Sequence, residues 1–223
     1  MNWSQFFKSA VGRKITMSLT GIFLILFLLL HAGLNACIWA NDGGAMFNAG
    51  AHFMGSTIIP RVLEVGLFVF FIIHVVQGIK LTIQNRSKRS VGYAVPMGNN
   101  GSKWYSRSMG LLGSLILIFI AVHLAHFWFP NRSNQGFLLG EEINLYEKMK
   151  EVFSHIAPVI IYELGVIALF WHLLHGFQSA FRTLGLSNHR YIGLIKGLGF
   201  WYSLIICLAF FFMPLSFHFG WIQ

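Results

Sequence analysis

Five long apolar stretches divide the chain, and polar or charged segments separate them. A helix that crosses a bilayer needs about 20 consecutive, mostly apolar residues. The stretches that reach this length are Ile15–Trp39, Ile58–Ile83, Met109–Phe129, Pro158–Phe181 and Tyr191–Phe212. The pattern therefore predicts an all-α integral membrane protein with five transmembrane helices in a single domain over residues 1–223.

The composition supports a lipid environment. Of the 223 residues, 56% are hydrophobic and 10% are charged, whereas about 25% are charged in an ordinary soluble domain. The net charge of +9 comes from basic residues between the apolar runs. They form no stripe with interleaved aromatic residues, so we expect membrane lipid and no nucleic acid as a partner.

The first apolar stretch has a possible second interpretation, because basic residues precede it and Leu34-Asn35-Ala36-Cys37 follows its centre, as in a lipoprotein signal peptide. The run Ile15–Trp39 is long enough to span a bilayer, so we expect a retained first transmembrane helix.

Lysine and arginine predict the orientation. Two loops lie on the side of the N-terminus; two loops and the C-terminus lie on the opposite side, called outer below. The N-terminal side carries twelve lysine and arginine residues and the outer side carries four. Loops rich in these residues stay in the cytoplasm, so we predict a cytoplasmic N-terminus and a C-terminus outside.

Three loops differ in character. Gln84–Arg107 is polar and basic, which predicts a landing surface for a soluble partner. Glu141–Phe153 has apolar residues at helical spacing, which indicates a short interfacial helix on the outer membrane surface; an ordinary amphipathic loop helix is an equal alternative. Asn41–Gly55 is rich in Gly and Asn and predicts no fixed structure.

An internal repeat selects four of the ten histidines. The first and third spans share a Met-x3-Gly-x9-His pattern, and the second and fourth share a His-x3-Gly pattern. The histidines of these patterns are His31, His123, His74 and His172. Ionisable residues inside a bilayer are costly and are usually functional. The chain therefore divides into two helix pairs of one design and a fifth helix.

The four histidines lie at two depths. With a rise of 1.5 Å per residue, His31 and His123 are roughly 22–24 Å from the inner ends of their helices, and His74 and His172 roughly 14–15 Å. Two levels with two histidines each suit two haems, each with an imidazole on both faces of the iron. Iron with both axial positions filled is suited to electron transfer. We predict a haem-binding bundle formed by the first four helices.

Other residues are candidates for contacts with the haems. Gly78 and Gly176, one turn after a selected histidine, would let a macrocycle approach the backbone. Ser18 and four basic residues lie near the inner face, where haem propionates need donors and where membrane-surface anchors also occur. These basic residues are Arg13, Lys14, Arg107 and Arg182.

Six histidines lie outside the repeat. His126 and His175 lie three residues beyond His123 and His172 and are alternative ligands. The other four are expected to be interfacial and are His52, His155, His189 and His218.

Two carboxylates lie in or near the spans, Glu64 and Glu163. Each has a structural interpretation, such as an ion pair between Glu64 and Arg61. Each also has a functional one, proton handling for a quinone near the outer haem, since quinone reduction takes up protons. Both interpretations are open.

Some cofactors are not expected on this chain. Cys37 and Cys207 are its two cysteines, and a cysteine-ligated iron–sulfur cluster usually needs four. No glycine-rich nucleotide motif occurs. Any dehydrogenase chemistry would therefore reside on a partner.

These features together resemble the cytochrome b subunit of succinate:quinone oxidoreductases (succinate dehydrogenase / fumarate reductase), in the di-haem, single-subunit class. The likeness rests on five spans, a histidine in each of the first four, an Arg-Lys…Met-x3-Gly start and the two His-x3-Gly motifs. It covers nearly the whole chain.

The resemblance implies a function in the bacterial inner membrane and the tricarboxylic acid cycle. The chain would be an anchor that passes electrons through two b haems between a docked iron–sulfur subunit and membrane quinone, with menaquinone as the quinone. A flavoprotein and an iron–sulfur subunit would dock on the cytoplasmic side. The implied pairing is His31 with His123 for the outer haem and His74 with His172 for the inner one.

The chain departs from the family at one position and leaves other classes open. Some members carry a glutamate two residues before the ligand histidine of the fourth span, where this chain has Phe170. A proton route of that kind would need Glu163 instead. The alternatives are a di-haem subunit of a formate dehydrogenase or hydrogenase, and a non-redox membrane protein.

Overall fold

Helices make up the regular structure of the chain. A computed structural model describes residues 2, 5, 7, 9–87, 103–135, 143–186 and 188–222, and no strand occurs among them. The helices in chain order are α2 (Ala10–Ala36), η1 (Cys37–Ala40), α3 (Ala45–Ser56), α4 (Ile58–Ser87), α5 (Trp104–Arg107), α6 (Met109–His123), η2 (Leu124–Trp128), α7 (Phe129–Gln135), α8 (Leu145–Phe153), α9 (Ile156–Thr183) and α10 (Ile192–His218).

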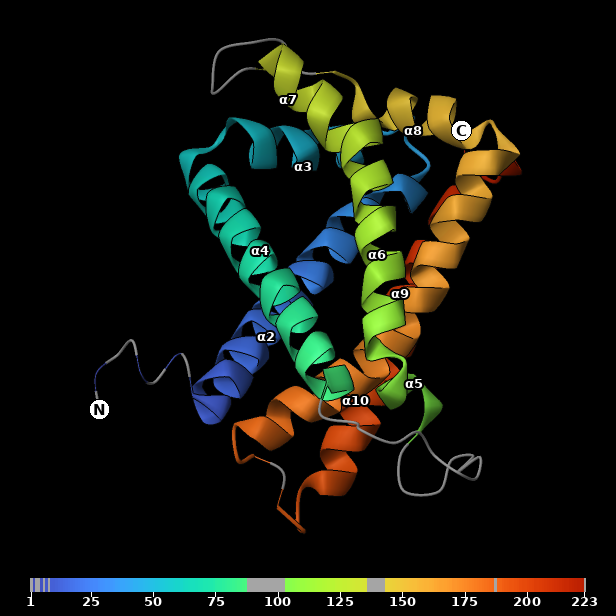
Figure 1. Ribbon diagram of the computed structural model, residues 1–223. Coiled ribbons are helices and arrows are strands. Elements are labelled where there is room, and N and C mark those ends of the chain that lie inside the picture. The colour runs from blue at the N-terminus through green and yellow to red at the C-terminus, as the bar shows by residue number, and fades with distance from the viewer. Residues whose placement is uncertain are drawn as a thin grey trace.

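The five predicted spans are confirmed as helices long and apolar enough to cross a membrane. They are Ala10–Ala40, Ile58–Asn85, Met109–Asn134, Ile156–Thr183 and Ile192–His218. The third combines α6, η2 and α7 into one continuous rod. The two termini lie at opposite ends of the bundle, and α3, α7 and α8 lie at the end that holds the C-terminus (Figure 1). This is the outer end.

Helix α9 is the centre of the packing. It contacts α2, α6 and α10, whereas α4 packs mainly on α2. The core between α2, α9 and α10 is built from Ile25, Val166, Leu173, Phe177, Ile195 and Cys207. A third of the most apolar part of α9 and of α10 is buried, compared with 6% for α6 and none for α4. Helices α4 and α6 thus leave most of their apolar surface to lipid or to a bound group.

A second core fills the outer end. Helix α8 begins where the Asn144 side chain accepts a hydrogen bond from the Glu147 N–H (3.1 Å). The helix predicted within Glu141–Phe153 is confirmed from Leu145 onward, while Glu141 and Glu142 lie outside the described residues. Its apolar side is buried by the chain itself, through Tyr146, Met149, Val152 and Phe153. This burial favours the alternative of an ordinary amphipathic loop helix, and the position of the helix at a membrane surface stays a prediction.

Helix α3 contradicts the prediction of no fixed structure in Asn41–Gly55. The Asp42 carboxylate accepts a hydrogen bond from the Met46 N–H (2.8 Å) and so holds the first turn. Phe47 is 5% exposed and anchors the helix in the outer core. Gly44 has a φ of +82°, and a side chain there would collide with the Tyr146 ring. Docking onto α8 therefore supplies the order that the local sequence lacks.

Tyr146 lies at the centre of this outer layer and is completely buried. Burial raises the pKa of its phenol, and the carboxylates of Glu147 and Asp42 raise this pKa further. The phenol therefore stays neutral over the whole physiological pH range.

The predicted landing surface Gln84–Arg107 is described at its two ends. Helix α4 runs to Ser87, and α5 follows from Trp104; residues 88–102 of this prediction lie outside the described residues. Tyr105 stacks on Trp171 of α9 with ring centroids 5.5 Å apart, which fixes α5 against the bundle.

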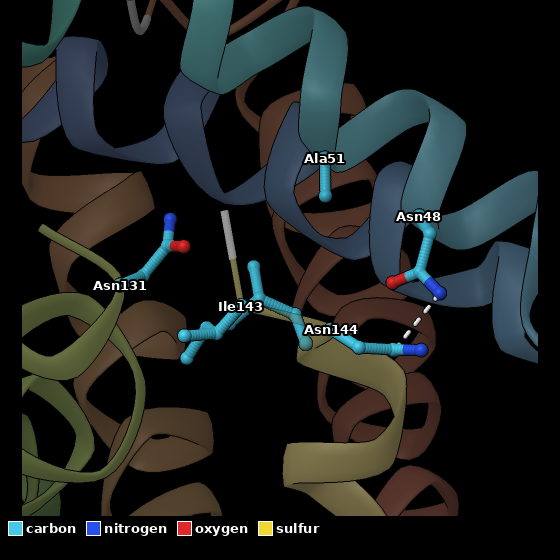
Figure 2. Close-up of a pocket in the computed structure, with 6 residues that line it drawn as sticks. Asn48, Ala51, Asn131, Ile143 and Asn144 are labelled. Carbon is cyan, nitrogen blue, oxygen red and sulfur yellow. Dashed lines mark hydrogen bonds between the residues drawn. The ribbon is translucent and has the colours of Figure 1, made fainter. Parts of the chain in front are cut away.

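A pocket of about 210 Å³ opens between the helices of the outer layer. Figure 2 shows Asn48 from α3 hydrogen-bonded to Asn144 at the start of α8 (3.0 Å), with Asn131 of α7 on the other side. The bond ties α3 to α8 where their apolar sides meet.

We predict that one glycine of α10, Gly199, is needed for packing and that another, Gly197, is not. A Cβ at Gly199 would lie 2.8 Å from Cδ1 of Phe177, whereas one at Gly197 meets nothing within 4 Å. Gly199→Ala should lower the free energy of unfolding by about 1–3 kcal/mol through overpacking. Gly197→Ala should change it by less than about 1 kcal/mol. Thermal unfolding of both variants in detergent checks this, and equal melting temperatures would contradict the packing.

Candidate functional site

The structure brings four of the ten histidines together in two pairs. The rings of His31 on α2 and His123 on α6 face each other with centroids 5.7 Å apart and planes at 87°. The rings of His74 on α4 and His172 on α9 have centroids 6.2 Å apart and planes at 64°. These are the four histidines that the repeat selects, and each pair joins two helices distant in sequence.

The ring separations fit a metal held between two imidazoles. An imidazole nitrogen lies about 2 Å from a metal that it binds and about 1 Å from its own ring centre, so two axial rings have centroids about 6 Å apart. Both observed separations are close to this value. Among the described residues, no group of three or more His, Cys, Asp or Glu side chains could hold a metal ion. Each pair therefore suits a metal that brings its remaining ligands with it, as in a macrocycle.

In the inner pair, the His74 ring has a hydrogen-bond partner on α2. The hydroxyl of Thr20, on α2, lies 3.2 Å from Nδ1 of His74 and donates to the Thr16 carbonyl at 2.8 Å. A hydroxyl has one proton, so with that proton engaged it accepts from the His74 Nδ1–H. This tautomer leaves the Nε2 lone pair free to bind a metal.

Two of the four rings have no hydrogen-bond partner at Nδ1 among the described residues. Nδ1 of His123 and Nδ1 of His172 are buried and make no hydrogen bond within the described chain. At His31 the side-chain amide of Asn35 approaches Nδ1 at 3.5 Å and donates to the His31 carbonyl at 2.8 Å. A buried polar atom without a partner is costly. The rings of His123 and His172 thus have bonding capacity that the chain itself does not use.

The glycines of the Met-x3-Gly-x9-His pattern lie against the inner histidines. A Cβ at Gly21 would lie 3.5 Å from the His74 ring, and one at Gly113 would lie 3.9 Å from the His172 ring. In each helix pair the glycine of the first helix lies against the histidine of the second. The position before the glycine breaks the symmetry, because it is Thr20 in α2 and Leu112 in α6. Among the described residues, a hydroxyl therefore lies at Nδ1 of His74 but not at Nδ1 of His172.

The three other candidate contact residues lie along the same helices. Ser18 is buried on α2 at 6% exposure. A Cβ at Gly78 would meet only the end of Met17, at 3.5 Å, and one at Gly176 would meet nothing within 4 Å. The packing of the described chain does not require glycine at Gly78 or Gly176. Both positions leave room for a non-protein group.

The alternative ligand His126 has a different partner. Its Nδ1 lies 3.1 Å from the Tyr162 hydroxyl, and the two rings stack at 5.8 Å with planes 7° apart. It lies in η2, a π-helical turn that begins directly after His123. The structure therefore directs His123, not His126, toward His31. His218, expected to be interfacial, bonds through Nδ1 to the Phe153 carbonyl (2.9 Å).

Glu64 is fully engaged. Arg61 donates to it at 3.1 Å, which confirms the ion pair considered from the sequence. Arg132 of α7 donates to both carboxylate oxygens, at 2.9 and 2.8 Å, and the Trp128 indole N–H donates as well. The last two contacts were not predicted, because Arg132 lies 68 positions away in the sequence.

Glu163 has the opposite environment. Both of its carboxylate oxygens are buried and make no hydrogen bond within the described residues. An ionised carboxylate at membrane depth is costly without a partner. Glu163 thus differs from Glu64 in having no hydrogen-bond donor among the described residues.

One comparison with known proteins gives a significant match. The chain is 28% identical over 172 residues to the succinate dehydrogenase cytochrome b558 subunit of Bacillus subtilis (strain 168), which covers 76% of this chain and 78% of that protein. No family model matches the chain, and no solved structure matches it. With its five apolar helices and this similarity, the chain is a multi-pass membrane protein with an all-helical fold.

Proposed function

We propose that this chain is the membrane anchor and electron-transfer subunit of a succinate:quinone oxidoreductase. The observation that carries the proposal is the pair of facing histidines at each of two levels, contributed by four different helices. The similarity to a succinate dehydrogenase cytochrome b558 subunit supports the same assignment. In this function two b haems carry electrons between a docked iron–sulfur subunit and quinone in the membrane.

The residues of the two pairs would hold the haems. His31 and His123 would supply both axial ligands of the outer haem, and His74 and His172 those of the inner haem. Bound haem supplies a reversible one-electron couple, and two histidine ligands leave its iron without an open position. The rings are half-buried in the bundle.

Other residues of the chain would fit the haem edges. Gly78 and Gly176 leave space beside the inner level. Near the inner end of α2, Nε of Arg13 is buried and bonds to nothing in the described chain. A haem propionate would supply an acceptor for this N–H, and the buried Ser18 lies five positions further along α2.

The partners would dock on the end of the bundle that holds the N-terminus. This end carries the excess of basic residues, which also makes it the cytoplasmic end. A flavoprotein and an iron–sulfur subunit would supply the dicarboxylate chemistry, and α5 (Trp104–Arg107) with the loop before it would form part of their landing surface. Quinone, with menaquinone as the expected species, would react near the outer haem.

We propose Glu163 as the proton carrier for this quinone. Reduction of a quinone takes up two electrons and two protons, so a site within the membrane needs a group that passes protons. Glu64 has both oxygens held by arginine, whereas those of Glu163 are unbonded within the described residues. This environment favours Glu163 over Glu64.

The first prediction from this proposal concerns haem content and tests the proposal directly. The purified chain should contain two b haems, measured by pyridine haemochrome assay against protein concentration. His31→Ala or His123→Ala should remove the outer haem, and His74→Ala or His172→Ala the inner one, because each haem would lose an axial ligand. A ratio near zero in the unaltered chain would refute the function.

The matched control for these variants is His126→Ala. It removes a histidine three residues from His123 whose ring stacks on Tyr162. Both haems should remain. Loss of a haem here, with retention in His123→Ala, would show that the ligand is one turn away from the proposed position.

A second prediction uses the difference between Thr20 and Leu112. A hydrogen bond accepted from Nδ1–H makes an imidazole a stronger donor to iron and favours the oxidised state. Thr20→Val removes this bond at His74 with little change of volume, so the midpoint potential of the inner haem should rise. A bond of about 1 kcal/mol corresponds to a shift of up to about 40 mV for one electron. Leu112→Thr, which offers a hydroxyl to His172, should lower it. Redox titration checks both directions, and shifts of the same sign would contradict the assignment.

A third prediction concerns Glu163. Glu163→Gln keeps the shape and removes the titratable group, so succinate:quinone turnover of the assembled complex should fall at least about tenfold. Haem content and electron transfer to a soluble artificial acceptor should persist. Glu151→Gln, at a carboxylate that is 69% exposed on α8, is the control and should have no effect. Unchanged quinone turnover in Glu163→Gln would remove Glu163 from the mechanism.

A further inference from the structure

The third spanning rod leaves α-helical geometry directly after the outer ligand His123. Residues Leu124–Trp128 form a π-helical turn, closed by a hydrogen bond from the Phe129 N–H to the Leu124 carbonyl. A π-helical turn is rare, and it rotates everything beyond it relative to a regular helix. Neighbouring elements therefore have to hold it in place.

Contacts on two sides hold the turn. On the side of α9, His126 bonds to and stacks on Tyr162. On the side of α4, the Trp128 ring packs on Phe68 at 5.0 Å between centroids, and its indole N–H donates to Glu64. Arg132 lies one turn further on, and its Nη2 donates to both oxygens of the same carboxylate.

These contacts matter to His123 because its ring touches residues of the turn and its neighbours. The centroid of Phe127, inside the turn, lies 5.6 Å from that of His123. The centroid of Tyr162, which stacks on His126, lies 5.9 Å from it. A change in the register of the turn would therefore displace side chains that contact the His123 ring.

Glu64 and its two arginine partners, Arg61 and Arg132, form a cluster that can hold the register of the π-helical turn. Arg61 is 4% exposed, and the Glu64 and Arg132 side chains are 22% and 23% exposed. Nη2 of Arg132 lies within hydrogen-bond distance of both carboxylate oxygens, and hydrogen bonds between charged groups are shorter and stronger than neutral ones. Helices α4 and α6 share little packing. The hydrogen bonds of Glu64 to Trp128 in η2 and to Arg132 in α7 therefore tie α4 to the third spanning rod at the outer end.

We propose that Glu64 is a positioning residue for the outer histidine pair. Together with Trp128 and Arg132 it forms a clamp that holds the π-helical turn and thereby aims His123 at His31. The charges of the clamp also act on the electron affinity of the group held between these rings. This inference rests on the proposed function only for what the rings hold; the clamp itself is a feature of the chain.

The charges of Glu64 and Arg132 predict the direction in which each substitution shifts the midpoint potential of the outer haem. Loss of the Glu64 carboxylate leaves the nearby arginines less compensated and favours an added electron, so Glu64→Gln should raise the midpoint potential of the outer haem. Arg132→Gln removes a positive charge and should lower it. Trp128→Phe changes no charge and should alter the low-spin electron paramagnetic resonance signal of the outer haem through the ligand geometry. The inner haem should keep its potential and its signal in all three variants.

The control is Glu151→Gln, which breaks the exposed ion pair with Lys148 on α8 at the same end of the molecule. It should leave both haems unchanged. Shifts of one sign in Glu64→Gln and Arg132→Gln, or equal changes at both haems, would show general destabilisation and overturn the proposal.

A second measurement tests the clamp without any haem. Spin labels at Ile59 of α4 and Phe129 of α7, which are 68% and 64% exposed, are placed in a chain whose Cys37 and Cys207 have been replaced. Their distance distribution should be narrow in the starting chain, broad in Glu64→Gln and Arg132→Gln, and narrow in Glu151→Gln. A narrow distribution in every variant would refute the clamp. If the purified chain contained no haem but still showed the broadening, the proposed function would be refuted and the clamp would stand.

Discussion

The requirement that two imidazole rings face each other across an apolar interior, at two levels, constrains the whole bundle. Within each repeat, the glycine of one helix lies against the histidine of the next: Gly21 against His74, and Gly113 against His172. The ring pairs themselves cross between the repeats, from α2 to α6 and from α4 to α9. Each histidine pair therefore spans the two halves of the chain, which also pack directly through α2 and α9.

The fold was predictable to the extent that the bilayer dictates it. A fixed hydrocarbon thickness demands a minimum apolar length, and all five spans follow from this requirement. The four facing histidines followed from a repeat, because duplication places equivalent residues at equivalent depths. Their function as ligands remains a prediction. Helix α3 was missed because its order comes from Phe47 and Tyr146, which meet only after α8 has docked.

The polar contacts near the candidate site were largely beyond sequence analysis. The Arg61–Glu64 pair was accessible because it is local, at spacing i, i+3. Arg132 reaches the same carboxylate only through the π-helical turn, which no periodicity predicts. Glu64 and Glu163 occupy similar positions in the repeat and looked alike in the sequence. The tertiary structure separates them, since one meets two arginines and the other meets no donor among the described residues.

The central place of α9 has a consequence for biogenesis. Spans enter the membrane in chain order as synthesis proceeds, and helices associate after insertion. The first three spans bury 11%, none and 6% of their most apolar parts even in the finished molecule. Before the fourth span leaves the translocon, α2 and α4 can already pack on each other, whereas α6 has little packing on either. Closure of the bundle thus waits for Ile156–Thr183, the helix on which both α2 and α6 pack.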